Sequence, residues 1–306
     1  MKMIERKFRK SWKHRRYNQI FIYLNGSNYH RYLLFVFFTF VYMSDWVFDT
    51  NKICRPCFDK VLVLTIPRFT ERQEKVKQRL NGISFDFFYG VDKNKMDREF
   101  ISQNYQYDKK NSLAIRQYFP PLNTGEIACA ISHRNIYQAM VDNGWKRVLI
   151  FEDDVVPDLE NLSLLSNCIK ELPANWELFY LGYLKNEKGT ATRQFKQFWY
   201  KMMSRFGFTR IPLFMIKNRL PKKFSPSLMR AGFHDCTHAY AVSLEGAKKL
   251  IPAQTPVKYR ADNLLSVLTM KGELNAFISK SLLFSQEIFL NENDTSHVRI
   301  QQKKIP

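Results

Sequence analysis

The sequence predicts an α/β fold around a mixed, mainly parallel β-sheet. Two short apolar runs, residues 59–67 and 84–91, flank residues 68–80, which show helical spacing and alternating charge. A strand, a helix and a second strand of these lengths form a parallel βαβ unit, the building block of nucleotide-binding α/β sheets. A third apolar run, Arg147–Val156, predicts a further strand and contains three consecutive acids.

The later elements extend this pattern. A helix is expected to begin at Thr124, as its N-cap, and to end at Asn143-Gly144. Residues 93–122 are polar and are expected to be irregular. Apolar runs between polar residues predict, in chain order, a strand Trp176–Gly182, a strand Thr237–Ser243, a helix Leu244–Ile251, a helix from Asp262 and a strand Phe277–Ser285.

The net charge of +20 is concentrated in two stretches. Residues 1–31 hold nine Lys or Arg and one acid, and residues 193–230 hold ten and no acid. This confinement predicts two basic contact surfaces beside a nearly neutral enzyme core. The second stretch also has eight aromatic residues, which favour an anionic membrane or glycolipid over nucleic acid. A disordered loop is the alternative, although its composition is too apolar for one.

We divide the chain into a basic segment (1–58), a folded domain (59–290) carrying the basic aromatic insert 193–230, and a tail (291–306). In the first segment, Tyr32–Met43 is an uncharged apolar run of 12 residues, short of the roughly 20 that span a bilayer. Interfacial anchoring and packing on the folded domain fit this run equally well. We expect membrane association on the cytoplasmic face, with the secretory-pathway lumen as the alternative.

The cysteines give only a weak signal. Five cysteines are too few for a disulfide scaffold in a chain of 306 residues. Cys54 and Cys57 form a single CxxC, and without a second pair this motif rarely binds zinc. We therefore interpret both as inert thiols.

The most informative feature is an acidic cluster, Glu152, Asp153 and Asp154, in the run RVLIFEDDVV. Parallel sheets bind ligands at the carboxyl ends of their strands. Three neighbouring carboxylates repel each other unless a cation neutralises them, so we predict Mn²⁺ or Mg²⁺ at Asp153 and Asp154. Such an ion would offset the charge of a leaving nucleoside diphosphate. Strand alternation would place Glu152 and Asp154 on one face and Asp153 on the other. A solvated acidic turn is the alternative.

Several stretches resemble glycosyltransferase family 25, the lipooligosaccharide galactosyltransferases and related collagen-modifying galactosyltransferases. The most specific are Gly125–His133 (GEIACAISH) and Phe151–Val155 (FEDDV), and the resemblance covers roughly residues 60–286. It rests further on Val61–Arg72, Gly90–Asp92, Thr237–Ser243 and Ser285-Gln286. The resemblance implies a GT-A-like fold and transfer of a hexose, galactose in particular, from a nucleotide-sugar such as a UDP-hexose. The acceptor would be a glycan, a glycolipid or a glycoprotein.

The resemblance also implies roles for individual residues on the donor side. Arg68 or Arg72 would bind the diphosphate, although Arg72 could equally be a charge on a helix surface. Asp92 would contact the nucleoside or merely shape a turn, and His133 would contact the phosphates or pack in the core. The full donor set is Thr65, Pro67, Arg68, Arg72, Asp92, Ser132, His133, Glu152 and Asp153.

On the acceptor side, His238 and Tyr240 are expected to share one face of a strand, where Tyr240 could stack on a sugar or pack in the core. An inverting transfer needs a carboxylate to take the acceptor proton. Asp262 is the first candidate and would also serve as a helix N-cap, and Asp235 is the second.

Two other classes of function remain open at this stage. A metal-dependent nuclease or phosphodiesterase would use the acidic cluster and the basic surface, but it would need a second acidic site that the sequence does not clearly offer. A catalytically silent sugar-binding protein would keep the fold alone. Nucleic acid is not an expected partner.

Overall fold

The computed structural model describes residues 57–109, 121–184, 191–209 and 211–289. The Tyr32–Met43 run, Cys54 and the tail 291–306 lie outside these residues, as does nearly all of segment 1–58. Within the described part of the chain, every helix is too short or too polar to traverse a bilayer.

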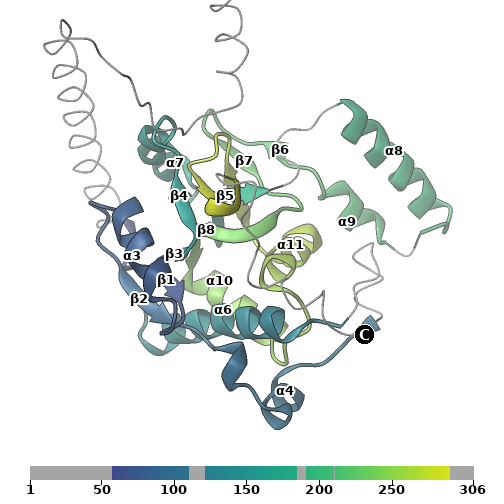
Figure 1. Ribbon diagram of the computed structural model, residues 1–306. Helices are drawn as coiled ribbons and strands as arrows, with labels where there is room; N and C mark the ends of the chain where they lie inside the picture. The colour runs from purple at the N-terminus through teal and green to yellow at the C-terminus, as the bar shows by residue number, and fades with distance from the viewer. Residues whose placement is uncertain (1–56, 110–120, 185–190, 210, 290–306) are drawn as a thin grey trace, which may run out of the picture. The chain divides into compact units, whose positions relative to one another are not determined.

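An eight-stranded mixed sheet forms the centre of the described domain (Figure 1). Six strands point in one direction, and the two reversed strands are β8 and β7. The expected α/β fold with a mixed, mainly parallel sheet is therefore confirmed. In spatial order the strands are β2 (Asp86–Tyr89), β1 (Lys60–Thr65), β3 (Arg147–Glu152), β8 (Asp235–Ser243), β5 (Leu178–Leu184), β9 (Ala276–Ser279), β7 (Leu228–Arg230) and β6 (Lys222–Lys223).

Helices and short turns connect these strands. The α-helices are α3 (Thr70–Arg79), α4 (Arg98–Asn104), α6 (Thr124–Asp142), α7 (Leu165–Glu171), α8 (Ala191–Arg205), α9 (Leu213–Lys217), α10 (Leu244–Ala253) and α11 (Ala261–Lys271). Three 3₁₀ turns complete the described elements, at Lys93–Lys95, Leu162–Leu164 and Glu287–Phe289. The expected irregular stretch 93–122 thus contains α4.

The main core lies on the face of the sheet that α6, α10 and α11 cover. Alternate residues of β1 and β3, such as Leu64 and Ile150, cluster there with Tyr137 of α6 and Leu250 of α10. Figure 1 shows α6 and α10 side by side, and the two helices are in contact. Because both faces of β1 are buried, its sequence is an unbroken apolar run rather than an alternating one.

Two predicted strands are divided in the structure. The run Arg147–Val156 leaves the sheet after Glu152, turns at Asp153 and Asp154, and starts a separate strand β4 (Val155–Pro157). Phe277–Ser285 likewise separates into β9 and β10 (Phe284–Gln286). β4 and β10 pair with each other in a second, two-stranded sheet. The expected alternation of the three acids along one strand is therefore wrong, because two of them lie in a turn.

The N-cap of α6 also differs from the prediction. The cap is Asn123, whose side chain accepts a hydrogen bond from the backbone of Glu126, while Glu126 bonds back to the Asn123 amide. This reciprocal capping box satisfies two donors that the first turn would otherwise leave free. Thr124 is the first residue of the helix instead of its cap.

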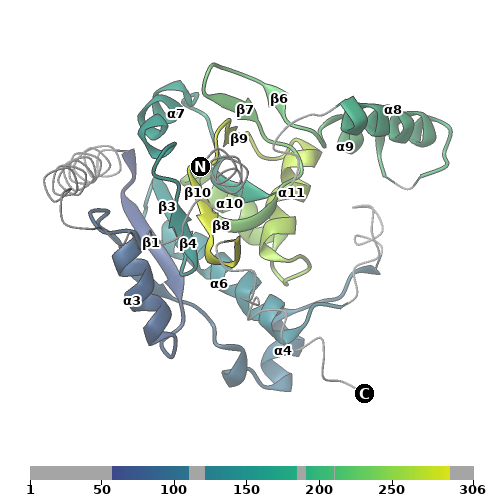
Figure 2. The same cartoon turned by 45° about the horizontal axis from the view of Figure 1, so that its top comes forward.

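The basic aromatic insert forms α8, α9 and the strands β6 and β7. β7 pairs with β9, so the end of the insert belongs to the main sheet. α9 contacts both α8 and α11, and Figures 1 and 2 show it between these two helices.

Candidate active site

The carboxyl ends of β1 and β3 lie side by side and form the floor of a cavity of about 200 Å³. The two strands are parallel, with Leu64 opposite Glu152. This register brings the acidic cluster next to the loop that follows β1. The polar side chains that line the cavity come from five parts of the chain: Thr65, Arg68, Arg72, Lys93, Cys129, Ser132, Glu152, Asp153, Asp154 and Gln286.

Asp153 is held by two partners from the β1–α3 region. Thr65 donates its hydroxyl hydrogen to Asp153 Oδ2 at 2.7 Å, and both side chains are buried. Arg72 Nη1 lies 2.6 Å from the other oxygen, Oδ1. Arg72 is therefore not a free surface charge of α3 but the counter-charge of the acidic cluster.

Asp154 is less well neutralised than Asp153. Its Oδ2 is 3.6 Å from Arg72 Nη2 and accepts a hydrogen bond of 3.3 Å from Gln286. Its Oδ1 is buried and has no hydrogen-bond partner among the described residues. Burial, and then the charges of Glu152 and Asp153, raise the pKa of Asp154 to about 7. This carboxyl group is the one that most needs a further cation.

Glu152 begins a buried hydrogen-bond chain. His133 Nε2 lies 3.2 Å from Glu152 Oε1, and Thr237 donates its hydroxyl to the same oxygen. On its other side, His133 Nδ1 lies 2.7 Å from the hydroxyl of Tyr240, which is 2.9 Å from that of Tyr137. Burial opposes ionisation of Glu152, but the hydrogen bonds of His133 and Thr237 outweigh it and lower the pKa of Glu152. Glu152 is therefore ionised near neutral pH.

The rim of the cavity on the β2 side carries cations. Arg68 binds Asp92 through two hydrogen bonds, Nε to Oδ2 at 2.7 Å and Nη2 to Oδ1 at 3.2 Å. Asp92 also accepts the backbone amide of Asn94, and the bond from Arg68 is the main cause of its lowered pKa. Lys93 lines the same rim, whereas Pro67 is exposed and lies outside the cavity lining.

Ser132 fixes the loop after β2. Its hydroxyl accepts the backbone amide of Val91 at 2.8 Å and donates to the carbonyl of Ala128 at 2.7 Å. A Cβ atom at Gly90 would lie 2.5 Å from Ser132 Oγ, so only glycine allows this close approach. Two stretches of the family resemblance, Gly90–Asp92 and Gly125–His133, are thus in direct contact through Gly90 and Ser132.

The two acids proposed for base catalysis lie on neighbouring elements. Asp262 accepts the backbone amide of Cys236 at 3.2 Å, and it occupies the first turn of α11. The N-cap of α11 is Arg260, so the predicted capping role of Asp262 is wrong. Burial, and then the charge of Asp235, raise the pKa of Asp262. Cys236, whose amide makes this bond, has a positive φ of 72°, which is a strained conformation for a residue with a side chain.

His238 and Tyr240 contact different elements. His238 Nε2 lies 3.2 Å from the carbonyl of Phe284 in β10, whereas Tyr240 bonds to His133 in α6. Both side chains are buried. In this arrangement neither residue offers a surface on which an acceptor sugar could stack.

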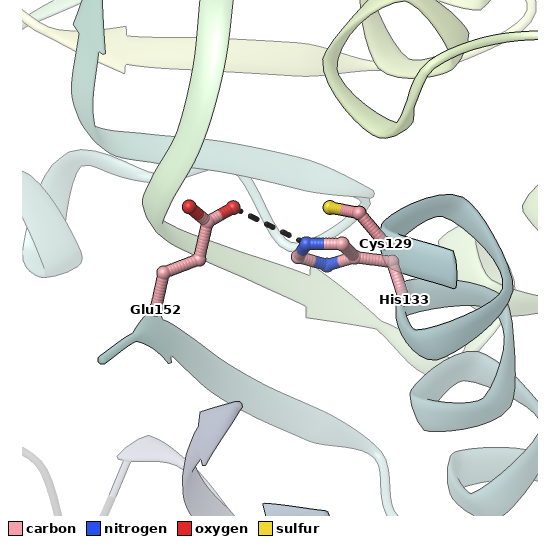
Figure 3. Close-up of side chains that lie close together, drawn as sticks. All are labelled: Cys129, His133 and Glu152. Atoms are coloured by element: carbon pink, nitrogen blue, oxygen red, sulfur yellow. Dashed lines mark hydrogen bonds and ion pairs between the residues drawn. The ribbon is translucent and has the colours of Figure 1, made fainter. Parts of the chain in front are cut away.

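Two donor sets in this region are able to hold a metal. Cys129, His133 and Glu152 bring one ligand atom each within 4.8 Å of one another. Figure 3 shows these three side chains close together. A sulfur and nitrogen set of this kind suits zinc. However, burial raises the pKa of Cys129 well above its usual value, and both ring nitrogens of His133 already have partners. The oxygens of Asp153 and Asp154 suit Mg²⁺ or Mn²⁺ better, because Asp154 has an unpartnered buried oxygen.

The residues of this region that were not predicted as site residues include Lys93, Cys129, Thr237 and Gln286. Cys129 is four residues before His133, a spacing that places both on one face of α6 and could have revealed it. Gln286 and Thr237 lie in motifs of the resemblance, but their contacts with Asp154 and Glu152 depend on tertiary structure.

A family model described as glycosyltransferase family 25 (LPS biosynthesis protein) matches residues 58–265. Inactive glycosyltransferase 25 family member 3 of Homo sapiens is 28% identical and aligns over 64% of this chain and 29% of its own. Procollagen galactosyltransferase 1 of Danio rerio is 24% identical over 78% and 35%, and procollagen galactosyltransferase 2 of Mus musculus is 25% identical over 79% and 38%. The chain thus spans about a third of the length of these relatives.

Among solved structures, the crystal structure of mouse xyloside xylosyltransferase 1 in its apo form aligns over 77% of this chain and 78% of its own. The TM-score is 0.35 and the identity 9%, a likeness too weak to support any argument. The relatives correct one expectation. Procollagen, which two of them name, is a protein of the secretory pathway, so the expected position on the cytoplasmic face of a membrane is contradicted.

Proposed function

Because the chain belongs to glycosyltransferase family 25, we propose that it transfers galactose from a UDP-sugar to a glycan, glycolipid or glycoprotein acceptor. The observation that carries this proposal is the meeting of three acids and three cations in one cavity at the carboxyl ends of β1 and β3. The names of the procollagen galactosyltransferases support galactose as the sugar.

In this proposal the cationic rim binds the donor diphosphate. Arg68 and Arg72 now neutralise Asp92 and Asp153, and Lys93 lies beside them. A diphosphate entering the cavity would compete for these guanidinium groups, which bind phosphate oxygens in pairs. Both guanidinium groups also contact the ring of Phe69, with their central carbons 4.8 Å (Arg68) and 5.4 Å (Arg72) from its centre.

Asp153 and Asp154 would hold Mn²⁺ or Mg²⁺. The unpartnered oxygen and raised pKa of Asp154 support this assignment, because a divalent cation would supply the missing counter-charge. When bound, such an ion offsets the charge that develops on the leaving diphosphate. Hydrogen bonds from His133 and Thr237 hold the carboxylate of Glu152 in place beside these two acids, where it would help to position the donor.

Asp262 is the proposed base of an inverting transfer. The acceptor hydroxyl oxygen would bond to the anomeric carbon as the bond from that carbon to the diphosphate breaks. The hydroxyl proton would pass to the Asp262 carboxylate, and UDP would leave. The raised pKa of Asp262 supports this role, because a stronger base accepts the proton more readily. Asp235 is the second candidate.

A catalytically silent protein is the alternative, since one relative is named an inactive family member. Turnover of UDP-[¹⁴C]galactose with Mn²⁺ distinguishes the two, with a collagen peptide and a lipooligosaccharide as acceptors. We expect release of UDP that requires the metal and is lost in Asp154→Ala but not in the surface control Asp142→Asn. Metal-dependent UDP binding without any release of UDP would support the silent alternative and contradict the proposal.

A further inference from the structure

Helix α8 faces the protein with its polar side. Gln197 Nε2 donates to the carbonyl of Ile216 at 2.7 Å, and Ser204 Oγ donates to the carbonyl of Ile211 at 2.9 Å. Between them, Tyr200 packs against the main core. At 100° per residue these three side chains lie on one side of the helix.

The opposite side of α8 and the residue just after it carry an apolar stripe of Phe195, Phe198, Trp199, Met203 and Phe206. The exposed fractions of these side chains are 63, 57, 57, 38 and 63%. Their spacing is that of the buried face of an ordinary surface helix. Yet none of the residues of α8, all of which the structure describes, is buried. The apolar face of α8 therefore points to solvent, and an exposed apolar face of this kind is typical of a contact surface.

The charges around the apolar stripe are all positive. Lys196, Lys201 and Arg205 lie on the same helix, and residues 191–230 contain no Asp or Glu. A second copy of this chain would bring these cations together without an acid to offset them, which disfavours self-association. Nucleic acid would match the charge but not a continuous phenylalanine surface. A bilayer with anionic headgroups matches both the charge and the aromatic side chains.

We propose that α8 is the docking surface for an anionic lipid bilayer. The apolar stripe enters the boundary between headgroups and acyl chains, and the three cations bind lipid phosphates. Phe208, whose amide donates to the Met203 carbonyl at 2.8 Å, is 76% exposed beside the stripe, and Phe214 on α9 is 51% exposed. This inference concerns a different part of the molecule from the proposed active site and does not depend on it.

Vesicle co-sedimentation of the full chain tests the proposal. Vesicles of phosphatidylcholine are compared with vesicles that also contain phosphatidylglycerol, at low and high salt. The test variant is Phe195→Ser/Phe198→Ser/Trp199→Ser, and the control removes three exposed apolar residues elsewhere, Tyr89→Ser/Leu159→Ser/Leu164→Ser. Both variants keep the basic residues 1–31, so any binding by that segment is the same in each.

We expect the test variant to lose at least about tenfold in partition onto the phosphatidylglycerol vesicles, and the control to remain within about twofold of the unchanged chain. Trp199 fluorescence should shift to the blue with these vesicles, and Trp199→Phe should abolish the shift while keeping binding. Equal partition of the test variant and the control would overturn the proposal. So would self-association, or nucleic-acid binding, that only the test variant loses while its vesicle binding stays intact.

Discussion

The cavity at the ends of β1 and β3 and the helix α8 hold charge in opposite ways. In the cavity, the acids are buried or half-buried and most of their oxygens have internal partners, as Asp153 has in Thr65 and Arg72. On α8, Lys196, Lys201 and Arg205 form no ion pair with any residue that the structure describes. The charged side chains of the cavity thus already pair with one another, and a ligand would have to displace these pairs. The cations of α8 are available to an external partner.

This difference separates two kinds of substitution. Changes to the ion pairs of the cavity should alter catalysis and stability together, because each of these charged side chains neutralises another. Changes on α8 should alter association alone, because an exposed charge or side chain contributes little to the folded state. The following predictions test this separation, from the largest expected effect to the smallest.

Asp154→Ala should abolish metal-dependent transfer, a loss of about 10³-fold or more in turnover, because the least neutralised carboxyl group of the cluster is the one that a cation needs. The fold should remain intact, as circular dichroism would show. Near-normal turnover in both Asp154→Ala and Asp153→Ala would mean that the cluster does not hold the metal.

Asp262→Asn should lower kcat by ~10²–10⁴ with little change in donor affinity, since the amide cannot accept the acceptor proton. The amide oxygen can still accept the Cys236 amide, so stability should be preserved. The measurement is kcat and donor Kd on the same preparation. A parallel loss of thermal stability and activity would instead assign Asp262 a purely structural role.

Arg72→Ala should lower the free energy of unfolding by about 2–3 kcal/mol in the absence of metal, because it leaves Asp153 buried with one partner fewer. Lys196→Ala on α8, an exposed residue, is the matched control and should stay within about 0.5 kcal/mol of the unchanged chain. Urea unfolding of both variants measures the contrast. If the two variants were equally stable, Arg72 would not stabilise the fold by neutralising Asp153, and this contrast between the cavity and α8 would be wrong.

The pKa of Asp154 predicts a smaller effect that depends on pH. Its value is raised from 3.8 to about 7, so the folded state binds more protons than the unfolded state between these values. Without metal, stability should therefore fall as pH rises from 4 to 7 and then level off. Asp154→Asn lacks this group and should be about 1–3 kcal/mol more stable than the unchanged chain at pH 8, but not at pH 4. Thermal melts across this range measure the difference.

The strand β1 and the acidic cluster were predictable because both signals are local. A buried strand appears as an unbroken apolar run, and three acids beside such a run stand out in the sequence itself. The predicted metal ligands remain predictions. The surroundings of these ligands could not be predicted from the sequence. The turn at Asp153 and Asp154 exists only where the chain leaves one sheet to start β4 in another.

Contacts between distant residues account for the rest of what the sequence did not reveal. Tyr240 and His133 are 107 positions apart, and their hydrogen bond forms where Tyr240 is packed into the main core, away from any bound sugar. Asp262 bonds to the amide of Cys236, a residue whose positive φ no local sequence pattern indicates. Local patterns predict a cap at Asp262, whereas the tertiary structure gives it a partner in β8.

Calorimetric titration of UDP into the full chain tests the central claim most directly, because it reports donor binding without requiring an acceptor. The account predicts that UDP binds in the presence of Mn²⁺ and at least about tenfold more weakly in Asp154→Asn or after chelation of the metal. It also predicts unchanged binding in Lys201→Ala on α8. UDP binding of equal strength with and without metal, or in the unchanged chain and Asp154→Asn, would contradict the assignment of this cavity as the metal-dependent donor site.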